Sequence, residues 1–162
     1  MSTRSVVAIP NENGDGWRGR YIHSDGYPEW VGACLWHIVK RDGLEQATRT
    51  LVHDNYGWSC LTTDTTRDPE QAEWRGEQRF VEGYGYPYDD EDETAWILSE
   101  GDKWGTEWAY LLTLDGLIVM EVDGDTTLAR GLFAWNGEEP YFVRKARERF
   151  GLTASGQVKV TV

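Results

Sequence analysis

Two apolar runs that flank Asp115-Gly116 constrain the fold of this chain more than any other feature of its sequence. The stretch reads LLTLDGLIVMEV and is the most continuously apolar segment of the chain. Asp-Gly between two such runs is a strong signal for a two-residue β-hairpin. Strands that are apolar on both faces are typical of the interior of a sheet. We therefore expect this hairpin near the centre of a β-sheet.

Further strands are expected on both sides of that hairpin. Residues 2–9 and 17–23 read as a second hairpin, joined by the turn-rich PNENGDG. Weaker strand signals lie in YGWSCLTT and in RFVEG, and ARGLFAW is a candidate for a last core strand. The final residues, SGQVKVTV, alternate between polar and apolar types, which is the pattern of a candidate edge strand.

Three segments carry helix signals. Pro28 suits a first helical position, and the apolar stripe that follows has helical spacing until Gly43. A second, shorter helix is expected directly after Gly43. A third is expected in NGEEPYFVRKARERFG, with Asn136 or Gly137 as its N-cap, two glutamates in its first turn and Gly151 at its end.

These elements predict an α+β fold. Strands that arrive as hairpins, with helices between groups of strands, favour one mainly antiparallel sheet of about five or six strands with two or three helices packed on one face. A chain of 162 residues is the size of one domain, and it contains no linker or internal repeat. We expect a single domain that spans residues 1–162.

The charge of the chain is concentrated in its middle quarter. The net charge is −12, and residues 64–107 carry fourteen of the acidic side chains against four basic ones. Such a charge repels nucleic acid and anionic membranes and favours a basic partner. No apolar run reaches the roughly 20 residues of a membrane span, and the N-terminus lacks a signal peptide's apolar region. We expect a cytoplasmic protein.

The same middle segment is rich in aromatic residues. Exposed rings flanked by carboxylates are good interface anchors, because rings bury a large area and charges select the partner. In YGYPYDDEDE five consecutive acids favour an exposed loop. The expected binding residues are Tyr84, Tyr86, Tyr88, Asp89, Asp90, Glu91, Asp92, Glu93 and Trp104.

The stretch HSDGYPEW, residues 23–30, allows two interpretations. His23 and Asp25 could act as a general base and its orienting acid beside a helix N-terminus. Alternatively the stretch is a joint between a strand and a helix, in which Gly26 permits the turn and Pro28 starts the helix. The second interpretation is favoured, because no third catalytic group stands at a telling spacing.

Other catalytic and metal-binding patterns are weak. Cys34 could be activated by His37 one helical turn later, but Cys34 falls within the apolar stripe. Two cysteines and three scattered histidines give no zinc spacing, and the acidic turns lack the residues of a calcium-binding loop. No phosphate- or dinucleotide-binding motif occurs. We expect no metal and no cofactor.

Several of these motifs together resemble a family. MSTRSVVAIP, GRYIHSDGYPEWVGACLWHIV, YGWS and GTEWAYLL are similar to small uncharacterised proteins of actinobacteria and their phages, which open with a TRS-type strand and carry DGYP before the first helix. The resemblance spans most of the chain. It implies a small cytoplasmic accessory protein, phage-related and therefore in the host cytoplasm, and it assigns no site residue.

Three functions compete at this point. The first is a non-enzymatic protein that binds a basic surface of a host protein, as an inhibitor whose carboxylates imitate nucleic-acid phosphates. The second is a small-molecule site, for a nucleotide or a sugar, that uses the HSDGYP loop. The third is a structural domain that oligomerises through its C-terminal edge strand. The acidic, aromatic middle favours the first.

Overall fold

The computed structural model describes residues 2–67, 79–88, 96–99, 105–123 and 126–150. Eight strands form one sheet, in the order β4-β3-β2-β1-β6-β7-β8, and β5 pairs with β2 off this path. The strands are β1 (Ser5–Pro10), β2 (Trp17–Ile22), β3 (Trp58–Leu61), β4 (Gly85–Pro87), β5 (Ile97–Leu98), β6 (Trp108–Leu112), β7 (Gly116–Asp123) and β8 (Thr126–Ala134).

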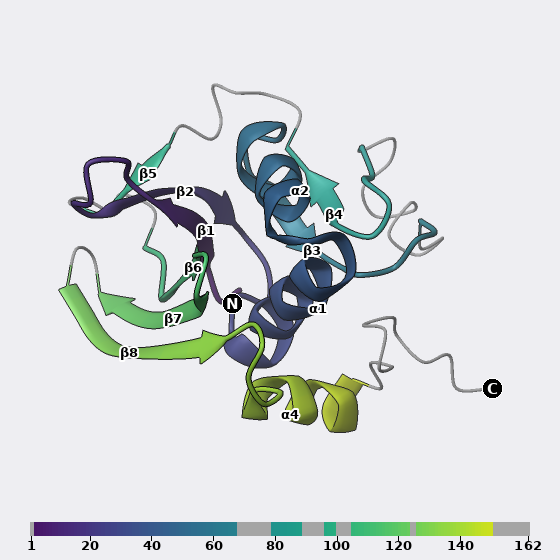
Figure 1. The fold of residues 1–162 in the computed structure, drawn as a ribbon. Coiled ribbons are helices and arrows are strands. Elements are labelled where there is room, and N and C mark those ends of the chain that lie inside the picture. The colour runs from purple at the N-terminus through teal and green to yellow at the C-terminus, as the bar shows by residue number, and fades with distance from the viewer. Residues whose placement is uncertain (1, 68–78, 89–95, 100–104, 124–125, 151–162) are drawn as a thin grey trace.

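The helices lie on one side of this sheet (Figure 1). A turn of π-helix, η1 (Pro28–Gly32), continues directly into α1 (Ala33–Asp42). After Gly43, α2 (Leu44–Thr48) continues into a second π-helical turn, η2 (Arg49–His53). The last helix, α4 (Tyr141–Phe150), packs against η1 and α1. Both helical segments expected around Gly43 are confirmed.

The α+β class is confirmed, but the sheet is larger than expected and mixed. The β1–β2, β3–β4, β6–β7 and β7–β8 pairs are antiparallel, whereas β1 pairs with β6 and β2 with β3 in parallel. The hairpin at Asp115-Gly116 is confirmed as β6–β7. The central strand is β1, which the hairpin flanks. Five strand pairs of the described sheet are antiparallel, with β2–β5 included, so the sheet is mainly antiparallel as expected. The two parallel pairs were not predicted, because they join segments far apart in sequence, which no local turn signals.

Two details of the C-terminal part also correct the sequence expectations. Helix α4 begins at Tyr141, after Pro140, so Asn136 and Gly137 do not cap it and no acidic residue lies in its first turn. Strand β8 lies at one edge of the described sheet, and none of its residues is buried, so it is not a core strand. The expected edge strand at 155–162 lies outside the described residues.

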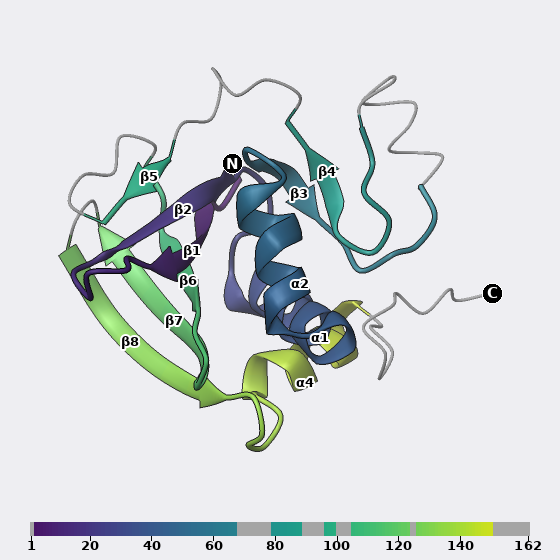
Figure 2. The same cartoon turned by 45° about the horizontal axis from the view of Figure 1, so that its top comes forward.

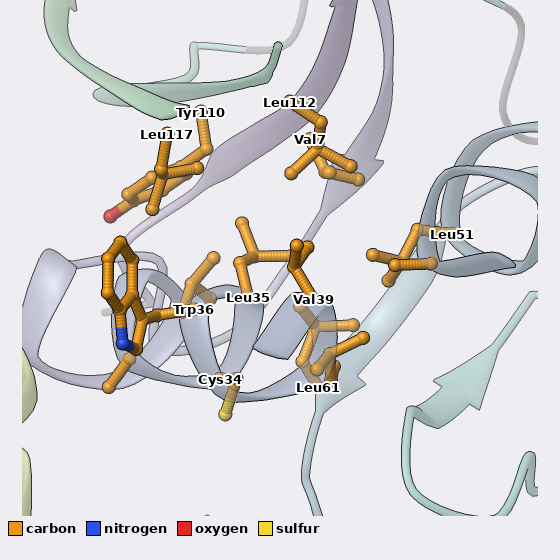
Figure 3. Close-up of a cluster of buried hydrophobic side chains, with 14 of the residues drawn as sticks. Val7, Cys34, Leu35, Trp36, Val39, Leu51, Leu61, Tyr110, Leu112 and Leu117 are labelled. Carbon is orange, nitrogen blue, oxygen red and sulfur yellow. The ribbon is translucent and has the colours of Figure 1, made fainter. Parts of the chain in front are cut away.

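The main core fills the space between the helices and the sheet. Figure 2 shows the strands from β8 to β4 forming an arc around α1 and α2. In Figure 3, Leu35 points toward Val7 of β1 and Trp36 points toward Leu117 of β7, while the Cys34 sulfur points away from these strands. Phe142, Val143 and Ala146 attach α4 to this core and are fully buried. The helical stripes thus bury the apolar face that their sequence spacing predicts.

A second cluster lies on the face of the sheet that turns away from the helices. It contains alternate residues of the central strands and one residue of β5, namely Val6, Ala8, Tyr21, Ile97, Ala109, Leu111, Ile118, Met120 and Val122. No described helix contributes to it. Because strands β1, β6 and β7 are apolar on both faces, the sheet has two apolar clusters and the helices cover only one.

Among the described residues, no helix is both long and apolar enough to cross a membrane.

Candidate functional site

The stretch HSDGYPEW forms the joint between β2 and the first helix. The backbone N–H of Gly26 donates to the carbonyl of Thr3 at 2.8 Å, and the Tyr110 hydroxyl donates to the carbonyl of Gly26 at 2.5 Å. A Cβ at Gly26 would lie 2.7 Å from the Ser5 side chain. Burial raises the pKa of Tyr110 well above its usual value, so this hydroxyl stays a donor. The structure therefore supports a structural role for Gly26.

The two catalytic candidates of this stretch have different partners. The Tyr21 hydroxyl lies 2.8 Å from Nδ1 of His23, whereas Asp25 is exposed and accepts a 3.4 Å hydrogen bond from the Tyr27 hydroxyl. Partial burial and the nearby Asp25 carboxylate raise the pKa of Tyr27. Asp25 has a positive φ of 55°, a conformation that suits the tight turn before Gly26. No contact between His23 and Asp25 supports an acid–base pair.

Tyr84 and Tyr86 were expected to be exposed, and this is wrong. Their side chains are 4% and 2% exposed. The Tyr84 hydroxyl donates to Oδ2 of Asp42 at 2.5 Å, and Arg41 holds the same carboxylate through two bonds of 2.9 Å. Positive φ angles at Gly83 and Gly85 turn this segment back onto β3, which places both rings in the interior.

The hydrogen bonds that join Tyr84, Asp42 and Arg41 go with a shifted pKa at each of these groups. Hydrogen bonds from Arg41 and Tyr84 lower the pKa of Asp42, and burial raises the pKa of Tyr84 to about 12. The pKa of Arg41 is raised by its bonds to Asp42. All three groups therefore keep their usual charges at neutral pH, and Tyr84 is a structural anchor between α1 and β4.

Of the remaining residues of the predicted binding region, only Tyr88 belongs to the described part of the chain. Tyr88 is partly buried and stacks on Tyr21 with 6.5 Å between ring centroids. The acidic run at 89–93 and Trp104 lie outside the described residues, so their part in binding remains a prediction.

The cysteine site does not have the features of a nucleophile. Cys34 is fully buried, and desolvation raises the pKa of its thiol. His37 is nearly buried on the same helix, and burial lowers its pKa. A buried neutral thiol is a poor nucleophile. Within the described part of the chain no three histidine, cysteine or acidic side chains gather as a metal site.

An acidic groove lies at the end of the sheet where β6 begins and β7 ends. Its volume is about 480 Å³, and its lining includes three carboxylate side chains, two aromatic rings and an exposed leucine. We call this the acidic groove and define it by Tyr27, Glu107, Trp108, Glu121, Asp123 and Leu128. Of the described residues that line it, every charged one is acidic.

Strand pairing brings these acidic residues together. The register places Glu121 opposite Trp108, and the backbone N–H of Val122 donates to the carbonyl of Glu107 at 2.9 Å. Because side chains alternate along a strand, Glu121 and Asp123 point to the same side while Val122 is buried on the other. Strand β8 contributes Leu128, which is 60% exposed. The groove thus combines carboxylates with accessible apolar surface.

A second hollow of about 320 Å³ adjoins the acidic groove. It is lined by Ser2, Arg4, His23, Gly105 and Glu107, and it shares the last two with the groove. The HSDGYP stretch therefore does reach a pocket through His23, as the second hypothesis expected. Besides His23, the described residues that line that pocket include a hydroxyl at Ser2, a guanidinium at Arg4 and a carboxylate at Glu107.

Sequence reasoning missed the acidic groove because its members are dispersed along the chain. Only one local signal existed: Glu121 and Asp123 alternate with Val122 at the end of an apolar strand. Compared with protein-family models, curated proteins and solved structures, this chain has no match.

Proposed function

We propose that this protein is a non-enzymatic binding protein that recognises a basic segment of another protein through the acidic groove. The observation that carries the proposal is the convergence of Glu107, Glu121 and Asp123 on one hollow between Tyr27 and Trp108. A partner's arginine or lysine side chain would pair with the carboxylates and stack on a ring. Leu128 would cover the aliphatic part of that side chain.

The charges of the groove set the strength and the salt dependence of this binding. An exposed ion pair contributes about 0.2–1 kcal/mol, and a cation–π contact at an exposed site contributes about 0.5–1 kcal/mol. A partner with several basic residues is therefore needed for useful affinity. The excess of acid in residues 64–107 would attract such a partner over a longer range and speed its association.

One specific version of this function is inhibition of a nucleic-acid-binding host protein. Carboxylates held on a rigid surface compete with phosphates for the same basic side chains. The resemblance to small actinobacterial and phage proteins favours such an accessory role, in the cytoplasm of the host cell. The acidic run at 89–93 would add to the electrostatic attraction of a basic partner.

The test is a fluorescence anisotropy titration of labelled hexa-arginine with the full chain. We compare wild type with the groove variant E107Q/E121Q/D123N and with the matched variant D115N/E138Q/E148Q, which removes three exposed acids elsewhere. Both variants change the net charge equally. The proposal expects the groove variant to weaken binding at least tenfold and the matched variant to weaken it about twofold.

Two further measurements separate binding at the groove from the effect of net charge. Neutralising the run at 89–93 with asparagine and glutamine measures its contribution separately. Raising the salt concentration from 50 to 500 mM should weaken wild-type binding strongly, because exposed ion pairs are screened. Equal losses in the groove variant and the matched variant would show that only net charge matters, and the groove would then have no specific role.

A second candidate function rests on the hollow beside His23. Arg4 and His23 line it together with Glu107, and a small anion such as a sugar phosphate would bind there through its phosphate on the two basic side chains. This candidate expects Arg4→Gln to abolish binding of ribose 5-phosphate, as measured by calorimetry, without affecting hexa-arginine binding. Absence of any heat with wild type would remove it.

A further inference from the structure

A cavity lined by both apolar and polar residues lies on the face of the sheet that turns away from the helices. Its volume is about 330 Å³, and it lies between the turn of the β1–β2 hairpin and strands β6 to β8. Its apolar lining includes Trp17, Leu111, Ile118, Met120 and Val122, most of which belong to the second cluster. It is therefore separate from the acidic groove, apart from Val122, which lines both.

Some strand residues around this cavity keep a small exposed fraction, as Val119 does on the helical face. The exposed fraction of Leu111, Ile118 and Val122 is 7–8%, whereas that of Tyr110 and Leu117 is zero. The first three line the cavity, and the other two pack in the helical core. A hollow lined by apolar side chains with a few polar groups is the usual form of a small-molecule pocket.

Arg130, which lines this cavity, has no ion-pair partner among the described residues. Pairing of Met120 with Arg130 places both side chains on the same face, and Arg130 lines the cavity from the edge strand β8. Arg130 is exposed and forms no ion pair or hydrogen bond with any residue that the structure describes. In a chain with 28 acidic against 16 basic residues, an arginine without a carboxylate partner is notable.

We propose that this cavity binds a small amphipathic anion, an aromatic carboxylate whose rings lie among Trp17, Leu111 and Met120 and whose carboxylate pairs with Arg130. An apolar cavity of about 150 Å³ holds one benzene ring, so this cavity has room for a fused pair of rings. A methionine thioether and an indole both favour contact with an aromatic ring. The guanidinium supplies the bidentate geometry that a carboxylate requires.

The size of the site also limits the affinity. A ligand of about fourteen heavy atoms that makes one ion pair should bind with a dissociation constant on the order of 0.1–1 mM. Arg130 should contribute about a fivefold gain in affinity, because the pair is solvent-exposed on one side. The neutral analogue should therefore bind more weakly but at the same place.

The test is a titration of the ¹⁵N-labelled full chain with 1-naphthaleneacetate, its neutral analogue 1-naphthaleneethanol and octanoate. The readout is the indole N–H resonance of Trp17, which the variant Trp17→Phe identifies. We compare wild type with Arg130→Gln and with Arg144→Gln, an exposed arginine on α4 that removes the same charge. Thr127→Trp, at an exposed position that lines the cavity, blocks it.

The proposal expects saturable shifts of the Trp17 resonance with wild type and Arg144→Gln. Arg130→Gln should weaken naphthaleneacetate about fivefold and leave naphthaleneethanol unchanged, and Thr127→Trp should abolish both. Weaker binding of octanoate would show preference for rings. No saturation with wild type at 5 mM naphthaleneacetate, or equal affinities of wild type and Arg130→Gln, would overturn the proposal. Hexa-arginine binding by the acidic groove is unaffected by either result.

Discussion

At the scale of single residues, Gly26 shows how one position fixes the entry into the first helix. Its backbone N–H donates a hydrogen bond to Thr3, and its carbonyl accepts one from the Tyr110 hydroxyl. The Ser5 side chain fills the space where a Cβ would lie. Packing and turn geometry therefore account for the glycine of the DGYP motif.

Replacement of Gly26 by alanine should destabilise the protein by about 1–3 kcal/mol, because the added methyl group has no room. Urea unfolding at pH 7.5 measures the change. Gly131→Ala is the control: its methyl group would meet only the ring of Phe133, 3.4 Å away. The control should change stability by less than about 0.5 kcal/mol. Equal stability of Gly26→Ala and wild type would contradict the account of the joint.

Tyr84 tests whether an aromatic residue beside the acidic run is an interface anchor or part of the core. Tyr84→Phe removes the hydrogen bond to Asp42 and should lower the free energy of unfolding by about 1–2 kcal/mol. Hexa-arginine binding should not change. If the variant kept full stability and lost binding, Tyr84 would be an interface residue after all.

His37 gives the protein a pH-dependent stability. Burial lowers the pKa of His37 in the folded protein below the 6.5 of an exposed histidine. The unfolded chain then binds the proton more tightly than the folded protein does. The stability that neutral His37 contributes is therefore complete above about pH 6.5 and decreases as the pH falls below that value.

Urea unfolding between pH 7.5 and 4.5 measures this effect in wild type and in His37→Gln. Wild type should lose stability across the interval more steeply than the variant does. Asp42, whose pKa is lowered, contributes a separate loss below pH 4, as its carboxylate becomes protonated. Parallel curves for the two proteins from pH 6.5 to 4.5 would show that His37 titrates normally.

At the scale of elements, the packing of α4 against the rest of the fold depends strongly on Phe142. Phe142 is fully buried, makes an edge-on contact with Phe133 of β8, and lies where a Cβ on Gly32 would meet it at 3.2 Å. It therefore holds α4 against both η1 and the edge of the sheet.

Phe142→Ala should destabilise the protein by about 3–5 kcal/mol, as expected for loss of a buried aromatic side chain. Tyr141→Ala, at a neighbouring position that is 45% exposed, should cost about 1 kcal/mol or less. Thermal unfolding followed by circular dichroism compares the two. Similar losses at both positions would mean that α4 is not anchored by its buried face.

At the scale of the whole molecule, local signals predicted local structure well. Asp115-Gly116 marked the β6–β7 hairpin and Gly43 separated two helical segments, because turn and cap chemistry depend on adjacent residues. The parallel pairing of β1 with β6 joins residues about a hundred positions apart, and no short motif encodes it. The mixed sheet could not be predicted for that reason.

The candidate site was harder to predict than the fold. Five consecutive acids suggested exposure of the preceding tyrosines, but Gly83 and Gly85 turn Tyr84 and Tyr86 into the core. The acidic groove depends on strand register, since Glu107 and Glu121 become neighbours only when β6 and β7 pair. The charge excess favours a basic partner as a hypothesis, which stays a prediction, and it does not specify the surface.

The central claim is that the acidic groove, and not the overall charge, recognises basic side chains. The most direct measurement is a titration of the ¹⁵N-labelled full chain with hexa-arginine, followed through the indole N–H of Trp108 and the amides of residues 121–123. The account predicts saturable shifts that are largest at these positions and disappear in E107Q/E121Q/D123N. Small, non-saturating shifts spread over all acidic residues would contradict it.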